Sequence, residues 1–177
     1  MSAVEKVLPY YTYEDYKHWK DRWELIDGIP YSMSPAPVPV NQSIAAKLST
    51  EFVNELKACD HCTVYQPIDY LIGKGTVLQP DLLISCSKIE KPYLDFAPML
   101  VCEILSPSTA LKDRHTKFGI FQEEKIPYYI IVAPKLQEVE IYQLGDDEYV
   151  LKQRGRDIRF GFRIDSCKAS INFSAIW

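Results

Sequence analysis

Residues 99–109 read Met-Leu-Val-Cys-Glu-Ile-Leu-Ser-Pro-Ser-Thr, an apolar run with one acid, Glu103, at its centre. Apolar side chains at both alternating sets of positions are typical of a strand that is buried on both faces of a sheet. The Ser-Pro-Ser-Thr stretch at 106–109 ends this strand and can cap a helix, which we expect over about 110–124. A second apolar strand is expected over 128–132. The region therefore predicts strand–helix–strand, the repeating unit of α/β sheets.

The remaining segments predict more strands and one further long helix. We expect a short helix after Thr12, a hairpin around Asp27-Gly28, a helix over 42–57, strands over 64–72 and 77–84, a hairpin over 139–152 and a last strand over 158–164. This order predicts an α/β fold with a mixed sheet flanked by helices. A length of 177 residues favours a single domain over residues 1–177.

Composition excludes several classes of protein. Hydrophobic residues make up 47% of the chain and charged residues 25%, the balance of a soluble globular protein. The longest unbroken apolar run, 128–133, has six residues, whereas a helix that spans a bilayer needs roughly 20. The first six residues lack the basic-then-apolar layout of a secretory signal. We therefore expect a cytoplasmic protein that has no membrane partner.

Positive charge gathers near the end of the chain although the formal net charge is −4. Between Lys152 and Lys168 there are six basic residues and two acidic ones. Such a segment can track the phosphates of a nucleic acid, or it can be an ordinary solvated strand face. The pattern alone leaves both interpretations open.

The five cysteines do not form a recognisable metal-binding pattern. Cys59 and Cys62 make one Cys-x-x-Cys, but a structural zinc site needs a second pair or suitably spaced histidines. His18, His61 and His115 show no such spacing. Cys86 and Cys102 stand among apolar residues, where a thiol acts as a small hydrophobe. A zinc-stabilised structural protein is therefore the most distant of the interpretations considered.

Two strands that are expected inside the sheet each carry an acid, Asp81 and Glu103. An ionised carboxylate removed from water is very costly unless it is paired or bound to a metal. Two acids on neighbouring strands also repel each other unless a cation neutralises both, and oxygen ligands of this kind suit Mg²⁺ or Mn²⁺. The alternative is that one or both acids form a salt bridge with Arg114 or Lys117.

These residues resemble a known family. Pro80-Asp81, twenty-one intervening residues and then Glu103 to Thr109 are similar to the signature of the PD-(D/E)XK nuclease superfamily and, more narrowly, of the Uma-two family of restriction endonucleases. Further matching stretches are Glu24 to Gly28, Met33 to Pro35, Asp113 with Lys117, and Ile126 to Val132. The resemblance covers about residues 12–151 and implies a restriction-endonuclease-like fold.

The resemblance implies a metal site. Asp81 and Glu103 are its implied metal ligands, and the backbone carbonyl of Ile104 is a third. The superfamily's catalytic lysine usually stands two residues after the glutamate, where this chain has Leu105. In the Uma-two pattern the lysine comes from the following helix, and Lys117 occupies that place.

Helical spacing agrees with this assignment, because it places Lys117 on a stripe with Phe121 that packs on the sheet. The alternative is a lysine whose stem covers apolar surface while its ammonium reaches water. Glu24 is a further implied catalytic acid, although it can equally be a hairpin-edge acid in solvent. At Asn41-Gln42, relatives often have a histidine.

Together these features predict a Mg²⁺- or Mn²⁺-dependent endonuclease that hydrolyses phosphodiester bonds of DNA. The metal acts as a Lewis acid and activates water, and Lys117 orients that water or offsets charge. Cutting both strands of a duplex favours a homodimer. The alternative function is a non-catalytic nucleic-acid-binding or assembly module on the same fold, and Leu105 keeps it open.

Overall fold

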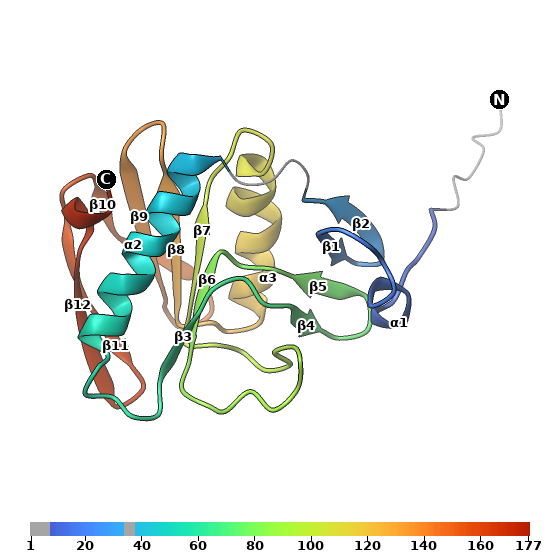
Figure 1. The fold of residues 1–177 in the computed structure, drawn as a ribbon, viewed down its shortest axis with the longest axis horizontal. Coiled ribbons are helices and arrows are strands. Elements are labelled where there is room, and N and C mark those ends of the chain that lie inside the picture. Colours follow the sequence, from blue (N-terminus) through green and yellow to red (C-terminus); the bar gives the residue numbers. More distant parts are fainter. Residues whose placement is uncertain (1–7, 34–37) are drawn as a thin grey trace.

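A six-stranded sheet forms the centre of the computed structural model, which describes residues 8–33 and 38–177 (Figure 1). Its order is β10 (Tyr149–Gly155), β9 (Glu138–Leu144), β8 (Tyr128–Ala133), β7 (Leu100–Ile104), β6 (Leu82–Ser85) and β3 (Thr63–Tyr65). Strands β7 and β8 run parallel, and the other neighbours are antiparallel. Because β7 and β8 are the predicted strand–helix–strand unit, the expectation of a mixed α/β sheet is confirmed.

A second, four-stranded sheet extends to the right in Figure 1, with the order β2 (Ile29–Ser32), β1 (Trp23–Ile26), β5 (Thr76–Leu78) and β4 (Tyr70–Ile72). The predicted hairpin joins β1 and β2, and its turn residues Asp27 and Gly28 both have positive φ, as a two-residue type I′ turn requires.

Each of the predicted strands over 64–72 and 77–84 proves to be two strands that lie in different sheets. The breaks fall at Pro67 and Pro80, and proline has no N–H to donate to a sheet ladder. Asp81 therefore stands where the chain passes from the small sheet into the central one.

Helix α2 (Pro39–Glu55) covers one face of the central sheet with its buried side chains Ile44, Leu48 and Phe52, which confirms the helix predicted over 42–57. The helix begins three residues earlier than expected because proline fits the first helical turn. The hairpin of β11 (Arg159–Ile164) and β12 (Cys167–Asn172) and the 3₁₀ helix η2 (Phe173–Ile176) complete this layer. Strand β12 and η2 were not predicted. The short helix α1 (Tyr13–Tyr16) was predicted, and Thr12 and Asp15 form its capping box.

The predicted helix over 110–124 is a π-helix, η1 (Lys112–Lys117), continued by α3 (Phe118–Glu123) on the other face of the sheet. A π-helix widens the turn, and such segments are frequent at functional sites. The Tyr129 hydroxyl donates a hydrogen bond of 2.9 Å to the carbonyl of Asp113, which accommodates the widened turn. Asp113 and Lys117, which both belong to η1, are buried.

Disulfides join Cys59 to Cys167 and Cys62 to Cys86, and Cys102 is a buried free thiol. The expectation of a small hydrophobe is met at Cys102. It is wrong at Cys86, because the fold places that residue against Cys62. No helix in the described ranges is both long and apolar enough to cross a membrane. Ser34 and Pro35, in the stretch Met33 to Pro35 that resembles the family, lie outside the described residues. A single domain over residues 1–177 stays a prediction.

Candidate active site

A cleft of about 640 Å³ opens where β1, the end of β7 and η1 meet, and both predicted metal-binding acids line it. The register of β6 with β7 pairs Leu82 with Cys102, so Asp81 and Glu103 stand side by side on adjacent strands. Oδ2 of Asp81 accepts a 2.7 Å hydrogen bond from the backbone N–H of Ile104, which ties the two strand positions together. The structure thus brings together the two acids that the sequence singled out.

Lys117 occupies the centre of these acids. Its Nζ lies 2.8 Å from Oε1 of Glu103 and 2.6 Å from Oε1 of Glu24, and the residue is only 2% exposed. The lysine therefore points inward, as its helical stripe predicted, and its ammonium does not reach solvent. The salt-bridge alternative holds for Lys117, whereas Arg114 pairs with Glu140 at 2.9 Å instead.

Glu24 belongs to the same site, and the interpretation of a hairpin-edge acid in solvent is wrong. Its side chain is fully buried, and Oε1 accepts a 2.9 Å hydrogen bond from the backbone N–H of Gln79. Besides Lys117, it forms an ion pair with Lys112. Strand β1 thus contributes an acid to a cleft that is otherwise built by the central sheet and η1.

Asp113 completes the site, and sequence reasoning assigned it no role. It is buried, and its Oδ1 has no hydrogen-bond partner within the described part of the chain, with Nζ of Lys117 at 3.5 Å. The i,i+4 spacing of Asp113 and Lys117 is the signal that could have found it, since residues four apart share a helix face. Lys112 could not be found in this way, because its partner Glu24 lies 88 residues away.

Asn41 holds the backbone beside the predicted third metal ligand. Its Nδ2 donates to the carbonyl oxygens of Ile104 and Leu105, each at 3.3 Å. A carbonyl oxygen has two lone pairs, so this contact leaves the Ile104 oxygen able to accept a second partner. The side chain of Leu105, at the usual position of the lysine, packs against the apolar core.

We call Glu24, Asp81, Glu103, Asp113, Lys112 and Lys117 the acid–lysine cluster. Burial raises the pKa of Asp81 and Asp113, and it raises that of Glu103 well above its usual range. Burial also acts against the ionisation of Glu24, but Lys117 and Lys112 outweigh it and lower the pKa of that carboxyl.

Burial likewise acts against the charge on Lys117, but the carboxylates of Glu103, Glu24 and Asp113 prevail and hold the pKa of Lys117 well above its usual value. Lys117 is therefore an ammonium at neutral pH, able to donate hydrogen bonds but not to accept a proton.

The donor chemistry of the cluster fits a divalent metal ion. With all six groups ionised, its four carboxylates and two ammonium groups leave two excess negative charges. One divalent cation balances that charge, and carboxylate oxygens are the ligands that Mg²⁺ and Mn²⁺ prefer. The unpartnered oxygen of Asp113 is a further available donor.

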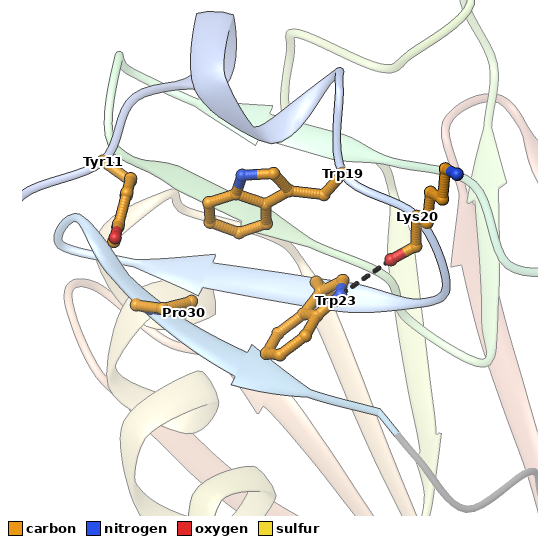
Figure 2. Close-up of a pocket in the computed structure, with 5 residues that line it drawn as sticks. All are labelled: Tyr11, Trp19, Lys20, Trp23 and Pro30. Atoms are coloured by element: carbon orange, nitrogen blue, oxygen red, sulfur yellow. Dashed lines mark hydrogen bonds between the residues drawn. The ribbon is translucent and has the colours of Figure 1, made fainter.

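A second hollow, of about 380 Å³, lies on the other side of β1 and has no acid in its lining (Figure 2). Its walls are Tyr11, Trp19, Lys20, Trp23 and Pro30. Successive side chains of a strand point to opposite faces, so Trp23 faces this hollow while Glu24 faces the cleft. The acids and both cluster lysines therefore gather in the cleft alone.

Comparisons with known proteins give one family and one fold. The family model Uma2, described as "Putative restriction endonuclease", matches residues 10–159. The uncharacterized protein slr1290 of Synechocystis sp. is 30% identical over 144 residues, which are 76% of this chain and 74% of that protein.

A crystal structure from Anabaena variabilis superposes with a TM-score of 0.75 at 14% identity and covers 93% of this chain and 96% of that one. It is described as a "putative nuclease belonging to DUF820". At this identity the likeness shows the fold, and it confirms the predicted restriction-endonuclease-like architecture.

Proposed function

The chain belongs to the Uma2 family of restriction-endonuclease-like proteins, and on this premise we propose that it is a Mg²⁺- or Mn²⁺-dependent endonuclease acting on DNA. The observation that carries the proposal is the contact of buried Lys117 with Glu103 and Glu24 in a cleft that Asp81 also lines. Buried charged groups with strongly shifted pKa values gather where a protein does chemistry.

Asp81, Glu103 and the carbonyl of Ile104 are the groups that we assign to the metal ion. Such an ion supplies Lewis acidity toward a phosphate oxygen and lowers the pKa of a bound water. Asp81 is held for this role by its hydrogen bond from the N–H of Ile104, and Asn41 fixes the neighbouring carbonyls. The ligands are therefore positioned by backbone contacts before any ion arrives.

Lys117 supplies positive charge in this proposal. Because it is an ammonium, it donates hydrogen bonds to the attacking water or to the phosphate oxygens as negative charge develops there. Glu24 keeps the ammonium in place through its 2.6 Å contact, and Lys112 balances the second oxygen of Glu24. In this proposal Glu24 is a positioning residue, and Asp81, Glu103 and Lys117 act on the reacting groups.

The test is cleavage of supercoiled plasmid, linear duplex and single-stranded DNA with Mg²⁺, with Mn²⁺ and with a chelator. We expect cleavage that requires the metal ion and is absent in Asp81→Asn. A homodimer is part of the proposal, because a symmetric pair of sites cuts both strands most simply, and light scattering on the DNA complex measures it. Binding of DNA and metal without cleavage of any substrate would favour the non-catalytic module instead. Leu105, which stands where the superfamily usually has its catalytic lysine, would agree with that result.

A further inference from the structure

A second group of metal-ligating side chains lies far from the acid–lysine cluster in the fold. Cys59, His61 and Cys62 lie in the loop between α2 and β3, Cys86 directly follows β6, and Cys167 begins β12. We call these five residues the sulfur cluster. It joins three parts of the fold that are distant in sequence, namely the end of α2, the edge of the central sheet and the β11–β12 hairpin.

The ligand atoms of four of these residues already lie close together. One ligand atom each from Cys59, His61, Cys62 and Cys167 can be chosen so that all four lie within 4.8 Å of one another. A tetrahedral zinc site with Zn–S bonds of roughly 2.3 Å has sulfurs about 3.8 Å apart. Small side-chain rotations are therefore enough to turn this group into such a site once its sulfurs are free.

The ring of His61 is held in the orientation that a metal ligand needs. Its Nδ1 lies 3.8 Å from Sγ of Cys59 and 3.4 Å from a carboxylate oxygen of the exposed Asp60, while its Nε2 lies 3.0 Å from a carboxylate oxygen of Asp165. Histidines that bind zinc usually give their second ring N–H to a carboxylate, which fixes the tautomer. Asp165 meets this requirement from the turn between β11 and β12.

The sulfurs are joined in pairs in this structure, and reduction frees them. Two molecules of a dithiol reductant each transfer two electrons and two protons, so that both protein disulfides become four thiols and each reductant becomes a disulfide. The sequence predicts a cytoplasmic protein, and cytosolic thiols are kept reduced. Three thiols of the freed set lose their protons when they bind a metal ion.

We propose that the reduced protein binds one Zn²⁺ through the thiolates of Cys59, Cys62 and Cys167 and the Nδ1 atom of His61. Zinc is the ion that such a tetrahedral sulfur and nitrogen donor set takes. Cys86 lies outside the group of mutually close ligand atoms and is the exchange partner of Cys62 in the oxidised state. The site is structural, because four protein ligands leave no open position for substrate.

The Cys-x-x-Cys motif lacked a second half in the sequence, and the fold supplies it. Cys167 comes from 108 residues beyond Cys59, and His61 lies inside the motif itself. Five residue steps separate Cys86 from Asp81, roughly 17 Å along an extended chain. The proposed zinc site therefore ties the fold together without contacting the acid–lysine cluster.

Cobalt titration of the reduced, metal-free protein tests this proposal. Co²⁺ bound by thiolates in a tetrahedral site gives intense sulfur-to-metal charge-transfer and ligand-field bands, which an oxygen site does not give. We expect these bands to saturate at one equivalent, to be abolished by added Zn²⁺ and to be absent from the oxidised protein. A reduced protein whose four freed thiols react with a thiol reagent, but which gives no such bands, overturns the proposal.

Variants test the choice of ligands. Cys59→Ser and Cys167→Ser should lose the bands. His61→Ala should bind Co²⁺ at least about 10-fold more weakly, because changing even a residue that only holds a metal ligand in place lowers metal affinity by about 10-fold or more. Cys86→Ser and Cys102→Ala, the matched thiol controls, should keep one equivalent. Loss in Cys86→Ser together with full binding in His61→Ala shows that the donor set is wrong. None of these measurements depends on nuclease activity.

Discussion

Strand β6 has an oxygen-rich group of side chains at one end and a sulfur-rich group at the other. Asp81 precedes its first residue and lies in the acid–lysine cluster, whereas Cys86 follows its last residue and lies in the sulfur cluster. The two also belong to different faces, because odd-numbered positions of β6 face α3 and even-numbered ones face α2.

The two clusters differ in what controls the availability of their ligand atoms. In the acid–lysine cluster, buried carboxylates are kept together by the ammonium of Lys117, so protons and cations control the balance of charge. In the sulfur cluster, covalent bonds join the donors in pairs, so reduction controls them. The comparison teaches that one strand can keep an oxygen-rich group and a sulfur-rich group of side chains apart. In our proposals the first group binds Mg²⁺ or Mn²⁺ and the second binds Zn²⁺, and the predictions below test that separation.

The largest effect is expected from removing a ligand of the oxygen-rich end. Asp81→Asn and Glu103→Gln should each abolish the rise in melting temperature that millimolar Mn²⁺ gives the wild type, since only a ligand that binds the native state stabilises it. The thiolate bands of bound Co²⁺ should be unchanged. An Mn²⁺ response that persists at full size in both variants would remove the acids from the metal site.

Lys117→Ala tests the ammonium. Leaving buried carboxylates without their partner should cost the metal-free protein about 3–5 kcal/mol of stability, and turnover should fall by on the order of 10² or more. The Mn²⁺-induced shift should grow, because a divalent cation then replaces the lost charge. Lys117→Arg should recover little turnover, since a planar guanidinium does not replace a compact ammonium. Equal cleavage by Lys117→Ala and the wild type would refute the role of Lys117.

The contrast between the ends of β6 also shows what the sequence could and could not foretell. Asp81 and Glu103 were singled out because an acid in an apolar strand is costly. Lys117 was singled out by the family resemblance, with which its position on the helical stripe agrees. The two buried strands β7 and β8 were predicted from their apolar pattern. The burial of Glu24, however, depends on the small sheet, and the pairing of Cys59 with Cys167 depends on β12, which local pattern did not predict. The π-turn that buries Asp113 also lacks a local signal, because its residues read as an ordinary helix.

A smaller effect is expected from pH at the oxygen-rich end. Asp81, Glu103 and Asp113 have raised pKa values in the folded protein, so the folded state holds their protons more tightly than the unfolded state. The metal-free protein should therefore lose stability as pH rises above about 5, beyond the unfolded values near 4. The lowered pKa of Glu24 has the opposite effect on stability. The stabilisation that ionised Glu24 gives the folded state is lost only as pH falls below the unfolded pKa, near 4.

Melting curves between pH 5 and pH 8 measure this dependence. The stabilisation by Mn²⁺ should increase across the same window, because the ion competes with protons for the carboxylates. Asp81→Asn is the control and should show a flatter metal-free profile. A wild-type profile that stays flat or rises with pH in this window would show that the folded state does not hold the protons of the three acids more tightly, since Glu24 is ionised in both states there and adds no slope.

The smallest effect concerns the basic segment from Lys152 to Lys168, whose basic side chains belong to neither of the two clusters. All six of its basic side chains are exposed, and Arg163 lies opposite Lys168 on the β11–β12 hairpin. If the segment tracks phosphates, the double variant Arg159→Glu and Arg163→Glu should flatten the log–log salt dependence of duplex binding by about 1.8, from about 0.9 per contact. Lys88→Glu, at another exposed lysine, is the control. If the slope of the salt dependence is the same in the double variant and the wild type, the DNA binds to another part of the surface.

Single-turnover cleavage by the wild type and Asp81→Asn, at saturating Mn²⁺ and with DNA binding measured in parallel, tests the central claim most directly. Both proteins should bind duplex DNA with similar affinity in the presence of a chelator, because Asp81 is assigned to the metal and not to the phosphates. The wild type should then cleave when Mn²⁺ is added, and Asp81→Asn should be slower by on the order of 10³. Equal cleavage by the two proteins, or a wild type that binds metal and DNA and never cleaves, would contradict the assignment of this cleft as a metal-dependent nuclease site.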